Sequence, residues 1–320
     1  MQFRSPVFIG IVTIVLFAIV PLWAPIFVVL FITEALILGL FAMSLDLQSG
    51  YSRMVSFGHS GPYGLGAYAT ALLMLHGQIP LPIAVLLATC IAALVAVPIG
   101  WMCTRGIGVA YAMLTLAFSQ LAYAVAIKWQ SVTGGSDGLP GLKRVVGPFG
   151  MDFFTSGGGY YLLVLGMLLG SFLLCRLFVC SPVGTTVLAL RGNETKALAL
   201  GYDVRLYRLG VFILSNALAG LAGGLYAGFA VFVSPELFFW TVSGQVLVMV
   251  IVGGSGTLLG PIVGAAIVLT LEHQLSAWTD SWGFFLGAIF VAVFIYAPRG
   301  IWGLLQRRIA PATASLRGES

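Results

Sequence analysis

Charged residues are scarce in this sequence. Asp, Glu, Lys and Arg together make up 8% of the 320 residues, whereas 60% are hydrophobic. Soluble domains carry roughly 25% charged residues because their surface must be hydrated. With about a third of that share, the chain lacks the groups that would cover a soluble fold with water. The composition excludes an ordinary soluble protein and indicates one that lies in a lipid bilayer.

Long basic runs and paired cysteines are also missing. The 15 Lys and Arg residues give a net charge of +5, but the densest stretches are the pairs Lys143-Arg144 and Arg307-Arg308. A nucleic-acid-binding protein gathers its basic residues into blocks, so this class is excluded. The cysteines show neither zinc-ligand spacing nor a disulfide framework, and we interpret them as buried free thiols. They are Cys90, Cys103, Cys175 and Cys180.

An ATP-binding loop is absent as well. A P-loop requires Gly-Lys-Ser/Thr, whose lysine reaches the nucleotide phosphates. The lysines are Lys128, Lys143 and Lys196, and none follows a glycine. The histidines His59, His76 and His273 fall in different apolar segments, without the spacing of a zinc site. We therefore expect no ATPase, no enzyme activity, and no cofactor or metal in this chain.

What the sequence has in abundance is long apolar runs separated by polar, proline and glycine breaks. In hydrocarbon every backbone polar group must be paired within the protein, so such runs of about 20 residues predict membrane-spanning helices. The predicted fold is an all-α integral membrane protein, a polytopic bundle of about ten spans forming one domain over residues 1–320. The expected spans are 7–22, 28–48, 56–76, 82–103, 108–128, 160–179, 209–230, 240–252, 258–275 and 282–298. Gly-rich breaks in the third span and between the eighth and ninth predict broken or re-entrant segments.

The distribution of basic residues predicts the orientation. With both termini in the cytoplasm, twelve basic residues lie inside, and Lys128, Lys143 and Arg144 lie outside. This excess is what the positive-inside rule predicts. The inner set is Arg4, Arg53, Arg105, Arg176, Arg191, Lys196, Arg205, Arg208, Arg299, Arg307, Arg308 and Arg317. Residues 131–159 then form an outer loop, and residues 181–208 and the tail 304–320 are cytoplasmic.

A few polar side chains fall within the expected spans. An ion-coupled carrier would place ionisable groups deep in the membrane. We expect Asp46 near the cytoplasmic end of its span and Glu272 near the outer end, which leaves Glu34 as the deeper carboxylate. Its alternative is a packing residue at the interface. Thr115, Ser119 and Gln120 form a polar patch that either lines a transport path or hydrogen-bonds its own backbone.

Glycines spaced by four are frequent among the 41 glycines of the chain. Small residues at this spacing leave a groove in which a second helix can approach closely. The grooves predict packing within this chain or against a second membrane subunit. The two triplets are Gly220, Gly224, Gly228 and Gly256, Gly260, Gly264; single steps are Gly166–Gly170 and Gly283–Gly287.

Five segments in order carry a family resemblance. The first is Gly50-Tyr51 with Ser56-Phe57-Gly58-His59 and Gly64, Gly66-Ala67-Tyr68. The others are Tyr111–Phe118 with Thr133-Gly134-Gly135 and Gly138-Leu139; Leu190-Arg191 to Gly201; Ala219–Gly224 with Ser234-Pro235-Glu236; and Val252-Gly253-Gly254 to Gly264-Ala265. From about residue 35 to 303, the chain resembles LivM-type permeases, the membrane subunits of branched-chain amino acid ABC transporters. It departs from their pattern at Asp46, Arg53, Met54, Pro62-Tyr63 and Leu198.

The resemblance implies an ATP-driven importer in the bacterial inner membrane. The implied partners are a second permease of the LivH type, two ABC ATPase subunits and a periplasmic solute-binding protein. Residues 181–208 would seat on the ATPases, with Arg191, Glu194 and Lys196 making polar contacts, Ala197, Ala199 and Leu200 filling a groove, and Gly201 ending a short helix. The path candidates are Glu34, Asp46, Ser56, His59, Thr115, Ser119 and Gln120. Alternatives are a permease for urea or another small amide or acid, an ion-coupled secondary carrier, or a membrane-embedded enzyme or scaffold.

Overall fold

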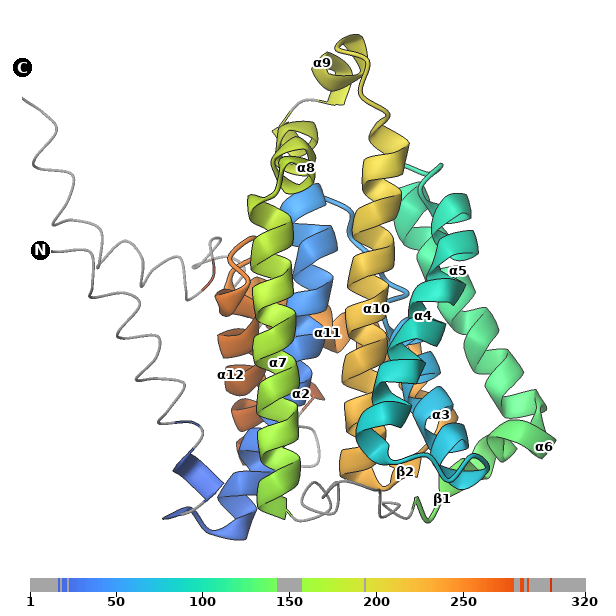
Figure 1. Cartoon of the computed structure of the whole chain (residues 1–320), viewed down its shortest axis with the longest axis vertical. Helices are drawn as coiled ribbons and strands as arrows, with labels where there is room; N and C mark the ends of the chain where they lie inside the picture. Colours follow the sequence, from blue (N-terminus) through green and yellow to red (C-terminus); the bar gives the residue numbers. More distant parts are fainter. Residues whose placement is uncertain are drawn as a thin grey trace, which may run out of the picture.

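The computed structural model describes residues 17, 19–21, 23–142, 157–192, 194–278, 283–284, 287 and 300. Within them the chain is almost entirely helical (Figure 1). The longer helices are α2 (Ile26–Asp46), α3 (Ser60–Leu75), α4 (Leu81–Cys103), α5 (Val109–Lys128), α7 (Gly157–Cys180), α8 (Pro182–Gly192), α10 (Val204–Ala230), α11 (Trp240–Gly253) and α12 (Leu259–Ser276). The short elements are η1 (Leu47–Tyr51), α6 (Gln130–Thr133), η2 (Gly135–Asp137), β1 (Leu139–Pro140), α9 (Glu194–Ala199), β2 (Phe232–Val233) and η4 (Pro235–Phe238).

The expected spans correspond to these helices. Each of the eight spans predicted between residues 28 and 275 overlaps one helix, and their ends differ by at most five residues. Six helices within the described residues are long and apolar enough to cross a bilayer: Ile26–Tyr51, Leu81–Cys103, Val109–Lys128, Gly157–Cys180, Val204–Ala230 and Leu259–Ser276. The prediction of an all-α polytopic membrane protein is confirmed. The expected spans 7–22 and 282–298 and the tail 304–320 lie largely outside the described residues.

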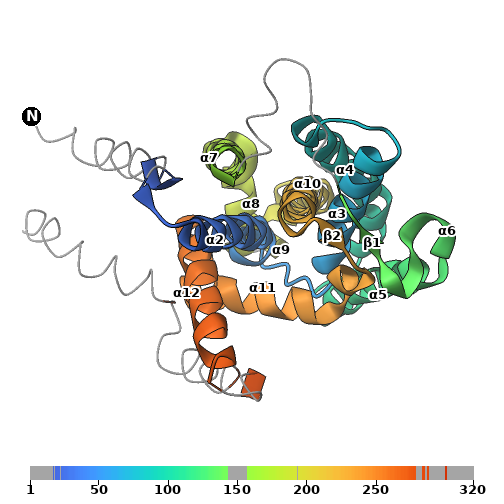
Figure 2. The ribbon, with the colours of Figure 1, turned by 90° about the horizontal axis from the view of Figure 1, so that it is seen from below.

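Helices α2 and α10 lie at the centre of the bundle. Helix α10 packs against α2, α3 and α4, whereas α2 also contacts α7, α11 and α12. Seen from below in Figure 2, α7 covers one side of this central pair, α11 covers the opposite side, and α5 with α6 lies at the far end from α12. Helices α8 and α9 extend beyond the bundle at the end opposite to β1 and β2 (Figure 1).

Glycines bring the backbones of α3 and α10 into direct contact. A Cβ added to Gly66 would meet the carbonyl oxygen of Gly220, and one added to Gly223 would meet the carbonyl oxygen of Tyr63. Close approach of this kind favours van der Waals packing in lipid. The expected glycine triplet of α10 is therefore occupied within the chain, where Gly220, Gly224 and Gly228 face Ala92, Thr70 and Leu81 respectively.

The second glycine triplet begins in the sharp turn between α11 and α12 and continues into α12. Positive φ angles at Gly254 (110°) and Gly256 (80°) reverse the chain in a conformation that glycine adopts without a Cβ clash. A Cβ on Gly264 would meet the carbonyl of Met249, so α12 packs directly on α11. Helix α11 has 14 residues, about 21 Å at 1.5 Å per residue, which is shorter than a bilayer core of about 30 Å.

A sheet of two strands, each two residues long, joins loops that are distant in the sequence at one end of the bundle. Leu139 pairs with Val233 and Pro140 with Phe232 in antiparallel register. Gly138 precedes the first strand with φ of 68°, and a Cβ there would meet the carbonyl of Val233. The segment that follows α6 is thereby fastened to the segment that follows α10.

Two features differ from the expectation. Residues 181–208, expected as a loop with one short helix, are mostly helical. Pro182 occupies the first turn of α8, where its missing N–H costs nothing. The side chain of Asp203 caps α10 by accepting from the amides of Arg205 (3.1 Å) and Leu206 (3.3 Å). The second difference concerns the cysteines: Cys103 and Cys175 are buried as expected, whereas Cys90 and Cys180 are exposed.

Candidate functional site

Three of the expected path residues line one cavity. Ser56, Thr115 and Ser119 face a space of about 470 Å³ between α3, α4, α5 and α10. Most of the wall is aliphatic or aromatic, with Leu65, Leu72, Ile91, Val95, Ile99 and Phe118 among its residues. Gln120 is not among the residues that line it, and the Gln120 Nε2 atom is buried without a hydrogen-bond partner among the described residues. The structure therefore separates Gln120 from the other two members of the polar patch.

A buried network of hydroxyls fixes one side of this cavity. Ser119 Oγ donates to the carbonyl of Phe238 at 2.6 Å, and Ser60 Oγ lies 2.7 Å from Ser119 Oγ. Ser243 Oγ donates to Ser60 Oγ at 2.9 Å and accepts from the Ser60 amide at 2.8 Å. Helices α3, α5 and α11 and the turn η4 are thus joined by side chains that satisfy one another. Thr115 instead donates to the carbonyl of Ala112 in its own helix at 2.9 Å.

His59 lies in the packed interior. Its side chain is fully buried, and its ring stacks on Phe41 with centroids 5.3 Å apart. Ser44 Oγ donates to the carbonyl of Phe41 at 2.6 Å, so His59 Nε2, 2.8 Å from Ser44 Oγ, is the donor of that pair. His59 Nδ1 has no partner among the described residues. These contacts are those of a packing residue.

Asp46 holds the turn between α11 and α12. Its Oδ1 accepts from the amide of Gly256 at 2.6 Å, and its Oδ2 accepts from the amide of Leu258 at 3.2 Å. The side chain is fully buried at the end of α2. A carboxylate with both oxygens committed to backbone amides is a structural clamp between residues about 210 positions apart in the sequence.

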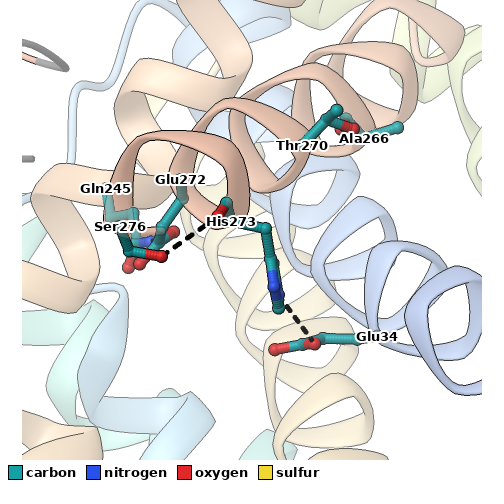
Figure 3. A network of polar contacts seen from close by, with 7 residues as sticks. All are labelled: Glu34, Gln245, Ala266, Thr270, Glu272, His273 and Ser276. Carbon is teal, nitrogen blue, oxygen red and sulfur yellow. Dashed lines mark hydrogen bonds and ion pairs between the residues drawn. The ribbon is translucent and has the colours of Figure 1, made fainter. Parts of the chain in front are cut away.

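Glu34 lines a second cavity of about 360 Å³, near the end of the bundle that carries β1 and β2. Figure 3 shows His273 pointing from α12 toward Glu34 on α2, with Glu272 and Gln245 beside them. His273 Nε2 lies 3.8 Å from Glu34 Oε2. Gln245 Nε2 donates to Glu272 Oε2 at 2.8 Å. Glu34 and Glu272 were expected within spans from the sequence, but nothing in the sequence indicated that His273 and Gln245 would join them.

Helix α9 projects from the opposite end of the bundle (Figure 1). Leu198 and Leu200 point outward with 56% and 76% of their surface exposed, whereas Ala197 is buried and Ala199 is exposed. Of the three side chains expected to fill a groove, Ala199 and Leu200 face outward and Ala197 faces inward. Leu198 also faces outward. Gly201 follows with φ of 85°.

The charged residues of this segment contact the bundle. Glu194 accepts from Arg208 Nη2 at 2.7 Å in an ion pair. A Cβ added to Gly256 would lie 3.4 Å from Arg191 Nη1, which places this guanidinium against the α11–α12 turn. Lys196 is exposed. Beneath the segment is a cavity of about 300 Å³ whose lining includes Arg53, Arg191, Glu194 and Arg208.

Comparison with known proteins assigns the family. The family model "Branched-chain amino acid transport system / permease component" matches residues 27–294. The chain belongs to this permease family. The permease is thus a membrane component of ABC transporters and a multi-pass protein of the inner membrane, and it associates with other components of such a transporter.

The relatives of the permease are permease proteins of transport systems. It is 26% identical over 313 residues to the high-affinity branched-chain amino acid transport system permease protein LivM of Escherichia coli K12, across 90% of this chain and 72% of that protein. Identity to LivM of Salmonella typhimurium is 26% over 309 residues, with the same coverage. Identity to the autoinducer 2 import system permease protein LsrC of Salmonella typhi is 28% over 240 residues, or 71% of this chain and 65% of that one. No solved structure matches the permease.

Proposed function

We propose that this permease carries branched-chain amino acids inward across the bacterial inner membrane as part of an ATP-driven importer. The observation that carries the proposal is the similarity to LivM, which extends over 90% of the chain. The similarity to LsrC covers less of the chain, and its name refers to a different solute, autoinducer 2. We assign the energy source to separate subunits, because the sequence has no Gly-Lys pair from which a P-loop could be built.

The proposed partners are a second permease of the LivH type, two ABC ATPases and a periplasmic solute-binding protein. The distribution of charge supports an orientation with the α8–α9 end in the cytoplasm. Arg53, Arg191 and Arg208 line one cavity there. Arg205 donates to the carbonyl of Trp101 at 3.0 Å at the same end. Positive charge of this kind is retained on the cytoplasmic side. If the spans expected from the sequence at 7–22 and 282–298 cross the membrane, both termini are cytoplasmic, and β1 and β2 face the periplasm.

The α8–α9 segment is the proposed seat of the ATPases. An exposed apolar pair, Leu198 in α9 and Leu200 directly after it, projects from the bundle, where a partner can cover it. Arg191 and the Glu194–Arg208 pair connect the segment to the α11–α12 turn and to α10. Movement of the ATPases would reach α10 and the α11–α12 turn through these contacts.

The proposed transport path includes the cavity of Glu34 and the cavity of Ser56, Thr115 and Ser119. The second has an apolar wall that suits a branched aliphatic side chain. We place Asp46 and His59 beside the path instead, because both carboxylate oxygens of Asp46 and the Nε2 atom of His59 are engaged in contacts that hold α2 in the bundle.

The experiment is uptake by proteoliposomes that contain the permease, its partner permease, both ATPases and the binding protein. We expect ATP-dependent accumulation of leucine, isoleucine and valine, and loss of accumulation when the ATPases carry an inactivating substitution. Accumulation of urea without leucine would transfer the proposal to the small-amide class. Accumulation by the permease alone in an ion gradient would identify a secondary carrier and overturn the proposal.

A further inference from the structure

The cavity that contains Glu34 combines carboxylates with aromatic rings. Its wall is built by α2, α3, α10, α11, α12 and η4, and its volume is about 360 Å³. The polar and aromatic residues that line it are Glu34, Tyr63, Tyr226, Gln245, Glu272, His273 and Ser276. Glu34 stands eight residues after the start of α2, about 12 Å along the helix. In the proposed orientation the cavity therefore lies in the outer part of the membrane.

The cavity holds more acidic than basic groups. Glu34 and Glu272 both line it, while no Lys or Arg is among the described residues of its wall. The nearest base is the half-exposed imidazole of His273, which lies 3.8 Å from Glu34 Oε2. A carboxylate away from bulk water is stabilised only by a paired charge or by hydrogen bonds. A cationic guest would supply the charge that these two carboxylates lack.

Tyr63 provides an independent indication of a guest. The residue is 2% exposed and lines the cavity, and its hydroxyl has no hydrogen bond to a described residue, so it is free to pair with a guest. The Tyr63 ring lies 5.8 Å from that of Tyr226 at an angle of 44°, so two aromatic faces border the same space. Aromatic faces next to carboxylates are the surroundings that proteins use to bind ammonium groups.

Gln245 positions one of the carboxylates. Its Nε2 donates to Glu272 Oε2 at 2.8 Å, which leaves the Gln245 carbonyl oxygen with no hydrogen bond to the described residues. An amide oxygen beside a carboxylate can accept a second N–H of the same ammonium group. The wall thus offers several acceptors for a group with up to three donors.

We propose that this cavity binds the ammonium group of the transported solute, with Glu34, Glu272 and Gln245 as acceptors and Tyr63 and Tyr226 as the aromatic faces. The inference rests on the proposed function, because an amino acid carries this ammonium and urea does not. The site adds a selectivity step within the membrane. A deaminated analogue such as 4-methylpentanoate keeps the branched chain but has no ammonium group that the carboxylates could bind.

The first test is leucine uptake by the full transporter with Glu34→Gln and Glu272→Gln. Each variant keeps its size but loses the charge, and we expect the KM for leucine to rise about ten- to a hundredfold, the effect of one charge-assisted hydrogen bond. The matched control is Glu236→Gln, which removes a charge from an exposed residue outside the cavity wall and should leave KM unchanged. Co-purification with the partners verifies assembly. A KM in both cavity variants equal to that of the control would overturn the proposal.

A second test does not depend on leucine transport. In permease whose Cys90 and Cys180 are replaced by alanine, Ser276→Cys places a thiol at the exposed edge of the cavity. We expect isobutylammonium to slow maleimide labelling of this thiol several-fold, and isobutanol to leave it unchanged. The protection should disappear when Glu34→Gln and Glu272→Gln are combined.

The two tests separate the two proposals. If the wild-type transporter takes up no leucine but isobutylammonium protects the thiol of the Ser276→Cys variant, the proposed function is contradicted and the site is retained. Equal labelling with isobutylammonium and isobutanol contradicts the site, whatever the transporter carries.

Discussion

The contact between α3 and α10 makes a quantitative prediction for Gly223→Ala. A Cβ at this position would meet the carbonyl oxygen of Tyr63 and approach its Cα to 3.1 Å. Because the obstruction is backbone, no rotamer change relieves it, and the two helices must separate. Overpacking of this kind costs about 1–3 kcal/mol.

Gly210 in the same helix provides the matched control. A Cβ there would meet nothing within 4 Å. Alanine is favoured over glycine in a helix by about 1 kcal/mol at both positions, so this contribution cancels in the comparison. We therefore expect Gly223→Ala to be about 1–3 kcal/mol less stable than Gly210→Ala, which itself should match or exceed the wild type.

The assay is equilibrium unfolding of the purified permease in mixed micelles, followed by far-UV circular dichroism. The free energy of unfolding is compared between the two variants. Surface substitutions without structural effect change the unfolding free energy by up to about 0.5 kcal/mol. If the two variants agree within this range, the backbones of α3 and α10 do not touch as described, and the predicted contact is refuted.

Three further substitutions test other contacts. Asp46→Ala leaves two amides of the α11–α12 turn without their acceptor and should lower the unfolding free energy by about 2–4 kcal/mol. Asp46→Asn keeps one acceptor and should have an intermediate unfolding free energy. Equal values for the two variants would contradict the clamp. Tyr111→Phe removes the buried donor to Gln48 Oε1 at 2.7 Å and should lower the unfolding free energy by about 1–3 kcal/mol in the same assay. The same substitution at a tyrosine whose hydroxyl is exposed should not lower it. Gly201→Leu, at φ of 85°, should strain the end of α9 by about 1–2 kcal/mol and uncouple ATP hydrolysis from uptake, whereas Gly210→Leu, where the φ is ordinary and the space is open, should not. Normal uptake in the former would count against the coupling assignment.

The membrane spans could be predicted from the sequence because apolarity over about 20 residues is a local signal. Residues 82–103 and 240–252 were located to within one residue at each end. Helix α8 was not predicted, although proline in the first helical turn, here Pro182, is typical of a helix start. The start of α10 was placed five residues late because Val204–Arg208 carries two arginines, which lower the apolarity without disfavouring a helix.

The candidate site could be predicted only in part, because its contacts join residues far apart in the sequence. The spacing of Gly220 and Gly224 predicted a groove, but not that Ala92 and Thr70 would fill it. Ser60 and Ser243, 183 positions apart, meet in one hydroxyl network that no spacing rule indicates. The meeting of α2 with α12, which joins Glu34 to His273, is likewise a property of the fold.

The pairing of β1 with β2 has a mechanical consequence. Its four residues are paired backbone to backbone and join the segment after α6 to the segment after α10, although these segments are more than 90 positions apart in the sequence. A displacement of the loop after α6 would therefore also reach the C-terminal end of α10, the helix around which the bundle is assembled, through main-chain contacts alone.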